Sequence, residues 1–269
     1  GAIRGIQTAP KYKPWFIHVN FAFPHDPRQW PKGMKNRYDA AKMPLPANFA
    51  KDHPFDHGNR GGRDEVLLPI PRVESEVREE LAIYYAMITD LDANLGRIIA
   101  ALPHPENTII IFTSDQGLAL GSHGLLGKQN EYEHSIRSPF IICGPGLPKN
   151  ERSTALIELQ DIFPTLCDLA DIPIPSTVQA KSLAPLLRHQ TDRVREFATG
   201  VFTDTQRMMC DERWKFVLYP KVNHEQLFDL QNDPDERHDL SADPAHAAKR
   251  DEMKARLQAW RQENGDPNL

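Results

Sequence analysis

The sequence lacks the features that mark membrane, nucleic-acid-binding or disulfide-stapled proteins. It has only three cysteines in 269 residues, widely separated, so the cysteine pattern predicts neither a disulfide framework nor a zinc site. No apolar stretch approaches the roughly 18 residues that a membrane span requires. No long basic run occurs and the formal net charge is −5, so nothing indicates a nucleic-acid surface. We expect Cys143, Cys167 and Cys210 each to be a buried, small apolar side chain.

The overall amino-acid composition is that of an ordinary globular protein. Hydrophobic residues make up 40% and charged residues 26%, and the length suits one sizeable domain or a domain with a smaller appendage. The 23 prolines outnumber the 15 glycines, which indicates extended loops between the elements. No secretory signal is recognisable in the first residues, which are polar and loop-like.

Three short apolar runs predict buried strands. Residues 15–21 are aromatic and β-branched, while residues 108–112 and 139–143 are apolar throughout, as in a strand buried on both faces. We interpret His18, in the middle of the first run, as a core histidine. Residues 27–71 are polar and rich in proline, which predicts a long loop that covers a surface or borders a site.

Two helices are predicted between and after these strands. From Val77 to Leu102 apolar residues recur at steps of four and three, which predicts a helix with one apolar stripe that ends before Pro103. Residues 161–169 predict a second helix with Asp161 as its N-cap. The alternation of strand and helix is typical of an α/β fold.

The character of the sequence changes after about residue 191. Short segments at 197–202, 207–210 and 215–219 alternate with turns, as in an antiparallel meander. A terminal amphipathic helix follows, with Met253, Leu257 and Trp260 as its stripe. We therefore expect residues 1–191 to form part of an α/β domain and residues 192–269 to form a smaller α+β subdomain.

A carboxylate and an amide directly follow the apolar run 108–112. Asp115 and Gln116 lie where α/β folds place their sites, at the end of a sheet strand, and both offer oxygen atoms to a cation such as Ca²⁺ or Mg²⁺. The alternative is a plain turn in which Asp115 caps neighbouring backbone amides. Three residues alone would favour that alternative.

The two residues belong to a longer ordered set of motifs. Ser114-Asp115-Gln116-Gly117 is followed by Leu120-Gly121-Ser122-His123-Gly124, by Lys128 thirteen residues after the aspartate, and by Tyr132-Glu133 and Arg137-Ser138-Pro139. In order and spacing this set resembles the pattern of the type I sulfatases of the alkaline-phosphatase superfamily. Further resemblance lies in Pro24-His25-Asp26-Pro27, in residues 161–166 and in residues 227–240.

This resemblance implies a fold and a set of roles. The fold would be part of an alkaline-phosphatase-like mixed sheet flanked by helices, followed by a small antiparallel sheet with a terminal helix. The implied activity is hydrolysis of sulfate esters, with Asp115 and Gln116 as metal ligands. Lys128 would pair with a sulfate oxygen, His25 would protonate the leaving alcohol, and His123 would contact the substrate.

The resemblance also implies a divalent metal, most suitably Ca²⁺ with Mg²⁺ possible, and a formylglycine nucleophile. In the family the nucleophile derives from a C/S-x-P-x-R motif, and no cysteine here has both Pro two residues on and Arg four residues on. This chain therefore corresponds to the C-terminal portion of a sulfatase, and we expect it to be inactive alone.

Two other functions remain open at this stage. A phosphodiesterase or phosphonate monoester hydrolase of the same superfamily usually carries His after the metal-binding aspartate, where this chain has Gln116. A non-catalytic module could instead bind sulfated glycans with a remnant site. We expect a sulfated saccharide or another sulfate ester as the partner, no nucleic acid and no membrane span, and a periplasmic or secreted location by analogy with the family. The sequence predicts no oligomeric state.

Overall fold

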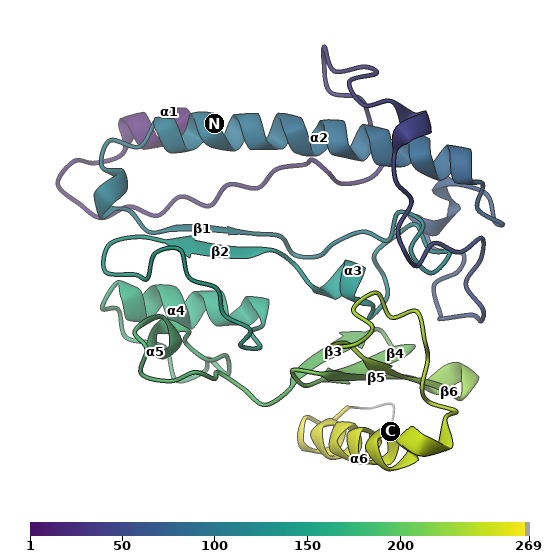
Figure 1. The fold of residues 1–269 in the computed structure, drawn as a ribbon. Coiled ribbons are helices and arrows are strands. Elements are labelled where there is room, and N and C mark those ends of the chain that lie inside the picture. The colour runs from purple at the N-terminus through teal and green to yellow at the C-terminus, as the bar shows by residue number, and fades with distance from the viewer. Residues whose placement is uncertain (267–269) are drawn as a thin grey trace. The chain divides into compact units, whose positions relative to one another are not determined.

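The computed structural model describes residues 1–266 (Figure 1). Their contacts group them into two compact units. The first unit comprises residues 1–53, 61–111 and 119–127, and the second comprises residues 54–60, 112–118 and those from 128 onward. The chain therefore passes between the units several times. The boundary near residue 191 is a different kind of division and stays a prediction.

The first unit is built on one long helix. Its elements are α1 (Ala2–Thr8), the 3₁₀ helices η1 (Ala40–Lys42), η2 (Glu65–Leu67) and η3 (Pro105–Asn107), and α2 (Glu74–Ala100). Acidic residues in the first turn of α2 and Arg97 in its last turn suit the helix dipole. The predicted helix is confirmed, and every residue of its apolar stripe is buried or half-buried except Ile88, which is exposed. The fully buried residues all lie in the first half of the helix, at Val77, Leu81, Ala82, Ile83, Ala86 and Met87.

The prediction of a buried strand at residues 15–21 is wrong. This segment contains no strand, and its side chains alternate between half-buried and exposed, with Phe16 74% exposed. His18 is exposed as well, so its interpretation as a core histidine is also wrong. The physical reason is that a strand needs a hydrogen-bonded neighbour, and none of the described residues pairs with this segment.

A buried ion pair organises the loops of the first unit. Arg72 is 1% exposed and donates hydrogen bonds to the carbonyl oxygens of Glu65, Leu68 and Gly124, and to the Glu65 carboxylate at 2.6 Å. The Glu65 carboxylate also accepts hydrogen bonds from the backbone N–H groups of Leu126 and Gly127. Two stretches about 60 residues apart in sequence are thereby joined.

The second unit begins with short strands and helices. β1 (Ile110–Thr113) pairs with β2 (Phe140–Cys143), and the second half of β1 belongs to this unit. Helix α3 (Glu133–Ile136) precedes β2 in the sequence, and α4 (Ile162–Leu169) and α5 (Ala184–Leu187) follow it. Both strands were predicted, but neither is buried on both faces: β1 is half-buried throughout, and Ile141 in β2 is 60% exposed. Cys143 is also exposed, contrary to prediction, whereas Cys167 and Cys210 are buried as predicted.

Asp161 occupies the N-cap position of α4, as predicted, but its side chain does not cap that helix. Its carboxylate accepts hydrogen bonds from the backbone N–H groups of Glu158 and Lys181 and from the Arg195 guanidinium at 2.5 and 2.7 Å. Burial opposes ionisation of Asp161, yet the hydrogen bonds from Arg195 and the two backbone groups outweigh it and hold its pKa below the ordinary value. Asp161 therefore fastens the chain on either side of α4.

The C-terminal part confirms the predicted antiparallel meander with a terminal helix. β3 (Ala198–Phe202), β4 (Gln206–Cys210), β5 (Trp214–Tyr219) and β6 (His224–Asp229) pair in sequence order, and α6 (Ala247–Glu263) packs on β4 and β5 (Figure 1). The strand β6 was not predicted as a strand. The core between helix and sheet comprises Met209, Phe216, Leu227, Met253 and Leu257, with Trp260 packed at its margin. The remaining 3₁₀ helices are η4 (Leu159–Asp161), η5 (Pro220–Val222) and η6 (Pro244–His246).

A buried lysine joins this sheet to the loop that precedes α3. Lys215, in β5, has no exposed surface, and its ammonium lies 2.6 Å from Glu133, 2.8 Å from Glu236 and 3.2 Å from the Glu131 carbonyl oxygen. Burial alone would lower the pKa of Lys215, but the charges of Glu236 and Glu133 outweigh burial and hold it above the ordinary value. The lysine therefore stays charged, and each of its three protons has an acceptor.

We predict that Lys215→Met destabilises the whole protein by about 3–5 kcal/mol, because it leaves buried carboxylates without their cation. Lys249→Met is the matched control, since Lys249 pairs with Glu252 on the surface of α6 and should contribute less than about 1 kcal/mol. Chemical denaturation of both variants measures the difference. Equal stability of the two variants would show that the Lys215 network has no structural role.

Candidate active site

The predicted metal ligands lie on the loop after β1. Asp115 is exposed and Gln116 is half-buried. The Ser114 hydroxyl donates to the Gln116 carbonyl oxygen at 2.6 Å, and the Gly117 N–H donates to the Ser135 carbonyl oxygen at 2.8 Å. A side chain at Gly117 would collide with the His134 carbonyl oxygen, so the loop can follow α3 closely only with glycine there. The loop thus offers two adjacent oxygen donors on a fixed backbone.

Two oxygen donors suit a hard divalent cation, although they do not complete its shell. Ca²⁺ takes about six to eight oxygen ligands, and both a carboxylate and an amide oxygen are among those it accepts. Among residues 1–266 no group of three or more His, Cys, Asp or Glu side chains is placed to hold a metal. The chemistry of Asp115 and Gln116 therefore fits the predicted cation, and the assignment of both residues stays a prediction.

Lys128 belongs to the second unit and is half-buried. The preceding residue, Gly127, donates its N–H to Glu65 at 2.8 Å, and the Lys128 N–H donates to the side-chain oxygen of Gln129 at 3.2 Å. The Gln129 carbonyl oxygen accepts a hydrogen bond from Gln206 at 3.1 Å. The backbone is therefore hydrogen-bonded before and after Lys128, which limits the positions that its ammonium can reach.

His123 belongs to the first unit, in a tight turn. Its backbone has a φ of 53°, in the left-handed region. Both its N–H and its ring Nε2 engage Asn48, at 2.9 Å to the carbonyl oxygen and 3.0 Å to the amide nitrogen. Since the Asn48 amide donates, Nε2 accepts and the imidazole proton lies on Nδ1. This turn gives the half-buried ring a defined orientation.

His25 also belongs to the first unit and is exposed. Its Nδ1 lies 2.7 Å from the Asp26 carbonyl oxygen, which can only accept, so Nδ1 carries a proton and Nε2 is the position that can exchange one. His25 lines an open hollow of about 360 Å³ together with Phe21, Ala22, Phe23, Asp26, Pro27 and Gln29. Because Nδ1 is held by the backbone, Nε2 is the ring atom left to exchange a proton with a leaving group at the hollow.

The second unit thus contains Asp115, Gln116 and Lys128, and the first contains His25 and His123. The roles implied for these five residues stay predictions. Sequence reasoning missed the buried polar groups around Lys128, namely Gln206, Lys215 and Glu131. The sequence shows only that Lys215 begins the predicted strand 215–219 and lies between Trp214 and Phe216, which does not reveal its buried partners.

Comparison with known proteins places the chain in a family. A sequence profile described as "Sulfatase" matches residues 2–172, which include all five candidate residues. The chain belongs to the sulfatase family. A second profile, described as "N-sulphoglucosamine sulphohydrolase, C-terminal", matches residues 121–263 and so covers the C-terminal sheet.

The curated relatives of this sulfatase-family chain include arylsulfatases. An arylsulfatase from Clostridium perfringens is 33% identical over 234 residues, covering 83% of this chain and 48% of the relative. Arylsulfatase K from Gallus gallus is 33% identical over 219 residues, covering 75% of this chain and 40% of the relative. The chain therefore spans less than half the length of these two relatives.

Solved structures with a similar fold include two phosphonate monoester hydrolases. The enzyme from Silicibacter pomeroyi has a TM-score of 0.85 at 25% identity, covering 100% of this chain and 60% of its own. The one from Agrobacterium radiobacter has a TM-score of 0.79 at 27% identity, covering 97% and 59%. A third structure, in complex with its substrate D-glucosamine-2-N,6-O-disulfate, has a TM-score of 0.67 at 26% identity, covering 78% and 45%. The predicted alkaline-phosphatase-like α/β fold is confirmed.

The sequence predicts no membrane span. Among the helices that the structure describes, none combines the length and the apolar character needed to cross a bilayer.

Glu131, three residues after Lys128, should make the stability of the protein depend on pH. Its side chain is buried against Gly200 of β3, and burial raises its pKa to about 7 against the lowering influence of Lys215 and Arg207. A carboxyl whose pKa is raised in the folded state holds its proton there while the unfolded chain has lost it. The resulting loss of stability begins above the ordinary pKa of 4.5 and is complete above about pH 7.

We therefore predict that Glu131→Gln stabilises the protein more at pH 8 than at pH 5, by at most about 3 kcal/mol. The measurement is the free energy of unfolding of wild type and variant at both pH values. Glu263→Gln, at the C-terminal end of α6, is the control and should show no pH-dependent gain. A gain at Glu131 that is the same at both pH values would contradict a raised pKa.

Proposed function

We propose that the protein containing this chain hydrolyses sulfate esters, and that its substrate is a sulfated saccharide. The observation that carries this proposal is the ordered set of motifs from Ser114 to Pro139 in a chain that belongs to the sulfatase family. The relative solved with D-glucosamine-2-N,6-O-disulfate supports a saccharide as the substrate class. No C/S-x-P-x-R motif occurs in these 269 residues, so the proposal concerns the whole protein.

In this proposal the chain's own residues bind the sulfate group and move a proton. The Lys128 ammonium pairs with sulfuryl oxygens, where its charge stabilises the negative charge that develops during hydrolysis. His25 delivers a proton from Nε2 to the departing alcohol, while its Nδ1–H donates to the Asp26 carbonyl oxygen. His123 contacts the substrate from a turn that Asn48 holds in place. Asp115 and Gln116 hold a divalent cation, which we propose to be Ca²⁺ and which supplies positive charge beside the sulfate.

A second candidate is hydrolysis of phosphonate monoesters, favoured by the TM-scores of 0.85 and 0.79 to two enzymes of that class. Residue 116 argues against it. An amide oxygen suits a hard cation, whereas an imidazole at this position would suit the transition metals typical of such hydrolases. We also propose a periplasmic or secreted location for the whole protein, consistent with a saccharide substrate.

The function test is an assay of the whole protein on an aryl sulfate and on an aryl phosphonate monoester. We expect the aryl sulfate to be hydrolysed with the higher kcat/KM, with activity lost on chelation and restored by Ca²⁺. Asp115→Ala should abolish the restored activity, and Asp171→Ala on an exposed turn is its control. A higher kcat/KM on the phosphonate would favour the second candidate, and no turnover of either compound would refute both.

The role of Lys128 is tested by Lys128→Ala in the whole protein. A charge that acts in the transition state lowers kcat when it is removed, so we expect a loss of roughly two to three orders of magnitude. Lys149→Ala, at an exposed loop lysine, is the matched control and should keep wild-type kcat. Thermal melts of both variants check the fold. Near wild-type kcat in Lys128→Ala would show that this lysine does not contact the reacting sulfate.

A further inference from the structure

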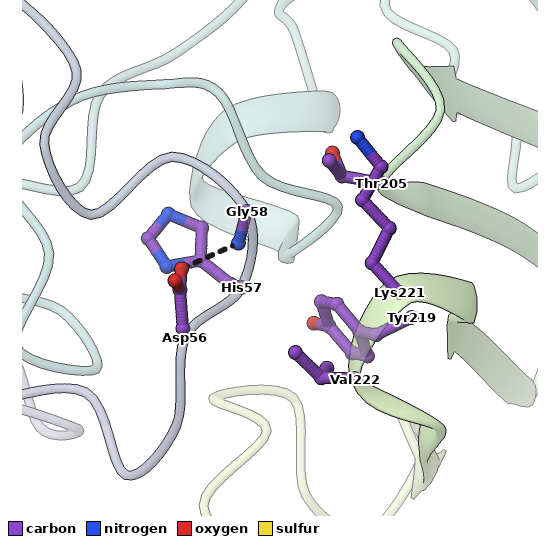
Figure 2. A pocket seen from close by; sticks show the side chains of 7 residues that line it. All are labelled: Asp56, His57, Gly58, Thr205, Tyr219, Lys221 and Val222. Atoms are coloured by element: carbon purple, nitrogen blue, oxygen red, sulfur yellow. Dashed lines mark hydrogen bonds between the residues drawn. The ribbon is translucent and has the colours of Figure 1, made fainter.

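The second unit contains a pocket that none of the assigned motifs explains. Its volume is about 240 Å³, and Figure 2 shows its two walls: the loop 56–58 on one side, and the β3–β4 turn with the end of β5 and η5 on the other. The lining residues are Asp56, His57, Gly58, Thr205, Tyr219, Lys221 and Val222. This volume lies below the roughly 300–1,000 Å³ of sites for drug-sized ligands, so the pocket suits a single small ring.

A buried amide places this pocket beside Lys128. Gln206 is fully buried in β4, and its Nε2 donates both to the His57 carbonyl oxygen at 2.9 Å and to the Gln129 carbonyl oxygen at 3.1 Å. One NH₂ group cannot reach two acceptors unless they lie within a few ångströms of each other. The wall residue His57 and the neighbour of Lys128 are therefore adjacent in the second unit.

The wall facing Lys221 presents a carboxylate on a fixed backbone. Asp56 is exposed, and its Oδ1 accepts the Gly58 N–H at 2.9 Å, as the dashed line in Figure 2 shows. Among the described residues no donor engages its second oxygen, Oδ2, which can accept a ligand hydroxyl. Gly58 has a φ of 92°, and any side chain there would collide with Thr205, so the two walls meet at this point. The pocket is thus closed at one end and open at the other.

The opposite wall mixes apolar and polar groups. The Tyr219 ring and the 44% exposed side chain of Val222 form an apolar floor. The Lys221 side chain extends past Thr205, with its ammonium 2.6 Å from Asp204 and 57% of the side chain exposed (Figure 2). A sugar ring has the matching chemistry, because its hydroxyls both donate and accept while its C–H face is apolar. A carboxylate oxygen that can accept a hydroxyl, beside an apolar floor, fits such a ring.

We propose that this pocket binds a sugar ring of the saccharide next to the ring that bears the sulfate to be cleaved. The inference rests on the proposed sulfatase function, because Lys128 marks the position of that sulfate. Asp56 accepts ring hydroxyls, Lys221 donates to a hydroxyl or an acidic substituent, and Val222 with Tyr219 contacts the apolar face. The pocket would therefore distinguish saccharides of two or more rings from single-ring sulfate esters.

The test uses Asp56→Asn in the whole protein, with Asp192→Asn at an exposed position as the matched control. The probes are 4-nitrophenyl sulfate, which has no second sugar, and a heparin-derived tetrasaccharide. A hydrogen bond to a charged group contributes enough that Asp56→Asn should raise KM for the tetrasaccharide about tenfold to a hundredfold with little change in kcat. Kinetics on 4-nitrophenyl sulfate should match wild type, and Lys221→Met should show the same selectivity.

Calorimetric binding of the tetrasaccharide separates the pocket from the proposed reaction. If wild type turns over neither probe, the proposed function fails. The pocket is then judged by affinity alone, which should fall at least tenfold in Asp56→Asn and not in Asp192→Asn. Three results would overturn the pocket proposal: no tetrasaccharide binding by wild type, equal affinity in Asp56→Asn and its control, or equal losses on both probes. Thermal melts identify a variant that fails to fold, in which case Lys221→Met decides.

Discussion

The packing of the C-terminal sheet against the segment 131–133 depends on charges buried inside the second unit, above all on the ammonium of Lys215. This single cation faces the side chains of Glu133 and Glu236 and the backbone of Glu131, so it joins β5, the loop before α3 and the segment after β6. Taking such a charge out of water costs several kcal/mol unless every proton finds an acceptor, and here each one does. The geometry is therefore specific: a residue that loses its place in this network leaves a buried charge behind.

In the sequence, Lys128 lies between two backbone segments that are hydrogen-bonded to buried polar side chains. On its N-terminal side, the Glu65 carboxylate holds the N–H groups of Leu126 and Gly127 and is itself held by Arg72. On its C-terminal side, the Gln206 amide holds the carbonyl oxygen of Gln129. These hydrogen bonds to buried polar groups fix the course of the backbone on either side of Lys128. The Lys128 side chain is flexible, but its backbone is held in place, so its ammonium can reach only a limited region. A preorganised charge of this kind is what electrostatic stabilisation of a sulfate would require.

Local patterns in the sequence predicted the elements that are stabilised by near neighbours. The long helix α2, the meander β3–β5 and the stripe of α6 were all predicted, because the period of their apolar residues is set by contacts within the unit. Residues 15–21 carry the composition of a strand without a pairing partner among the described residues, and composition cannot supply one. The same limit explains Lys215: a charged residue in a strand reads as a solvent-facing position unless its distant partners, such as Glu236, are known. The motif residues around Asp115 were found through their order, whereas the pocket beside Gln206 depends on residues some 150 positions apart.

The two hydrolase classes that share this fold differ in chemistry more than in backbone. High TM-scores to phosphonate monoester hydrolases and 33% identity to arylsulfatases coexist in one chain, so the course of the backbone alone cannot select the reaction. In the function that we propose, selection falls to the side chains that would hold the cation. Gln116 offers an amide oxygen where a site for softer cations would offer an imidazole nitrogen, and oxygen donors favour Ca²⁺ or Mg²⁺. If Asp115 and Gln116 hold such a cation, it would share with Lys128 the stabilisation of negative charge on a sulfate ester, and neither group would have to be the sole stabiliser. The proposal of a sulfate ester therefore rests on residue 116 rather than on the global similarity of the backbone.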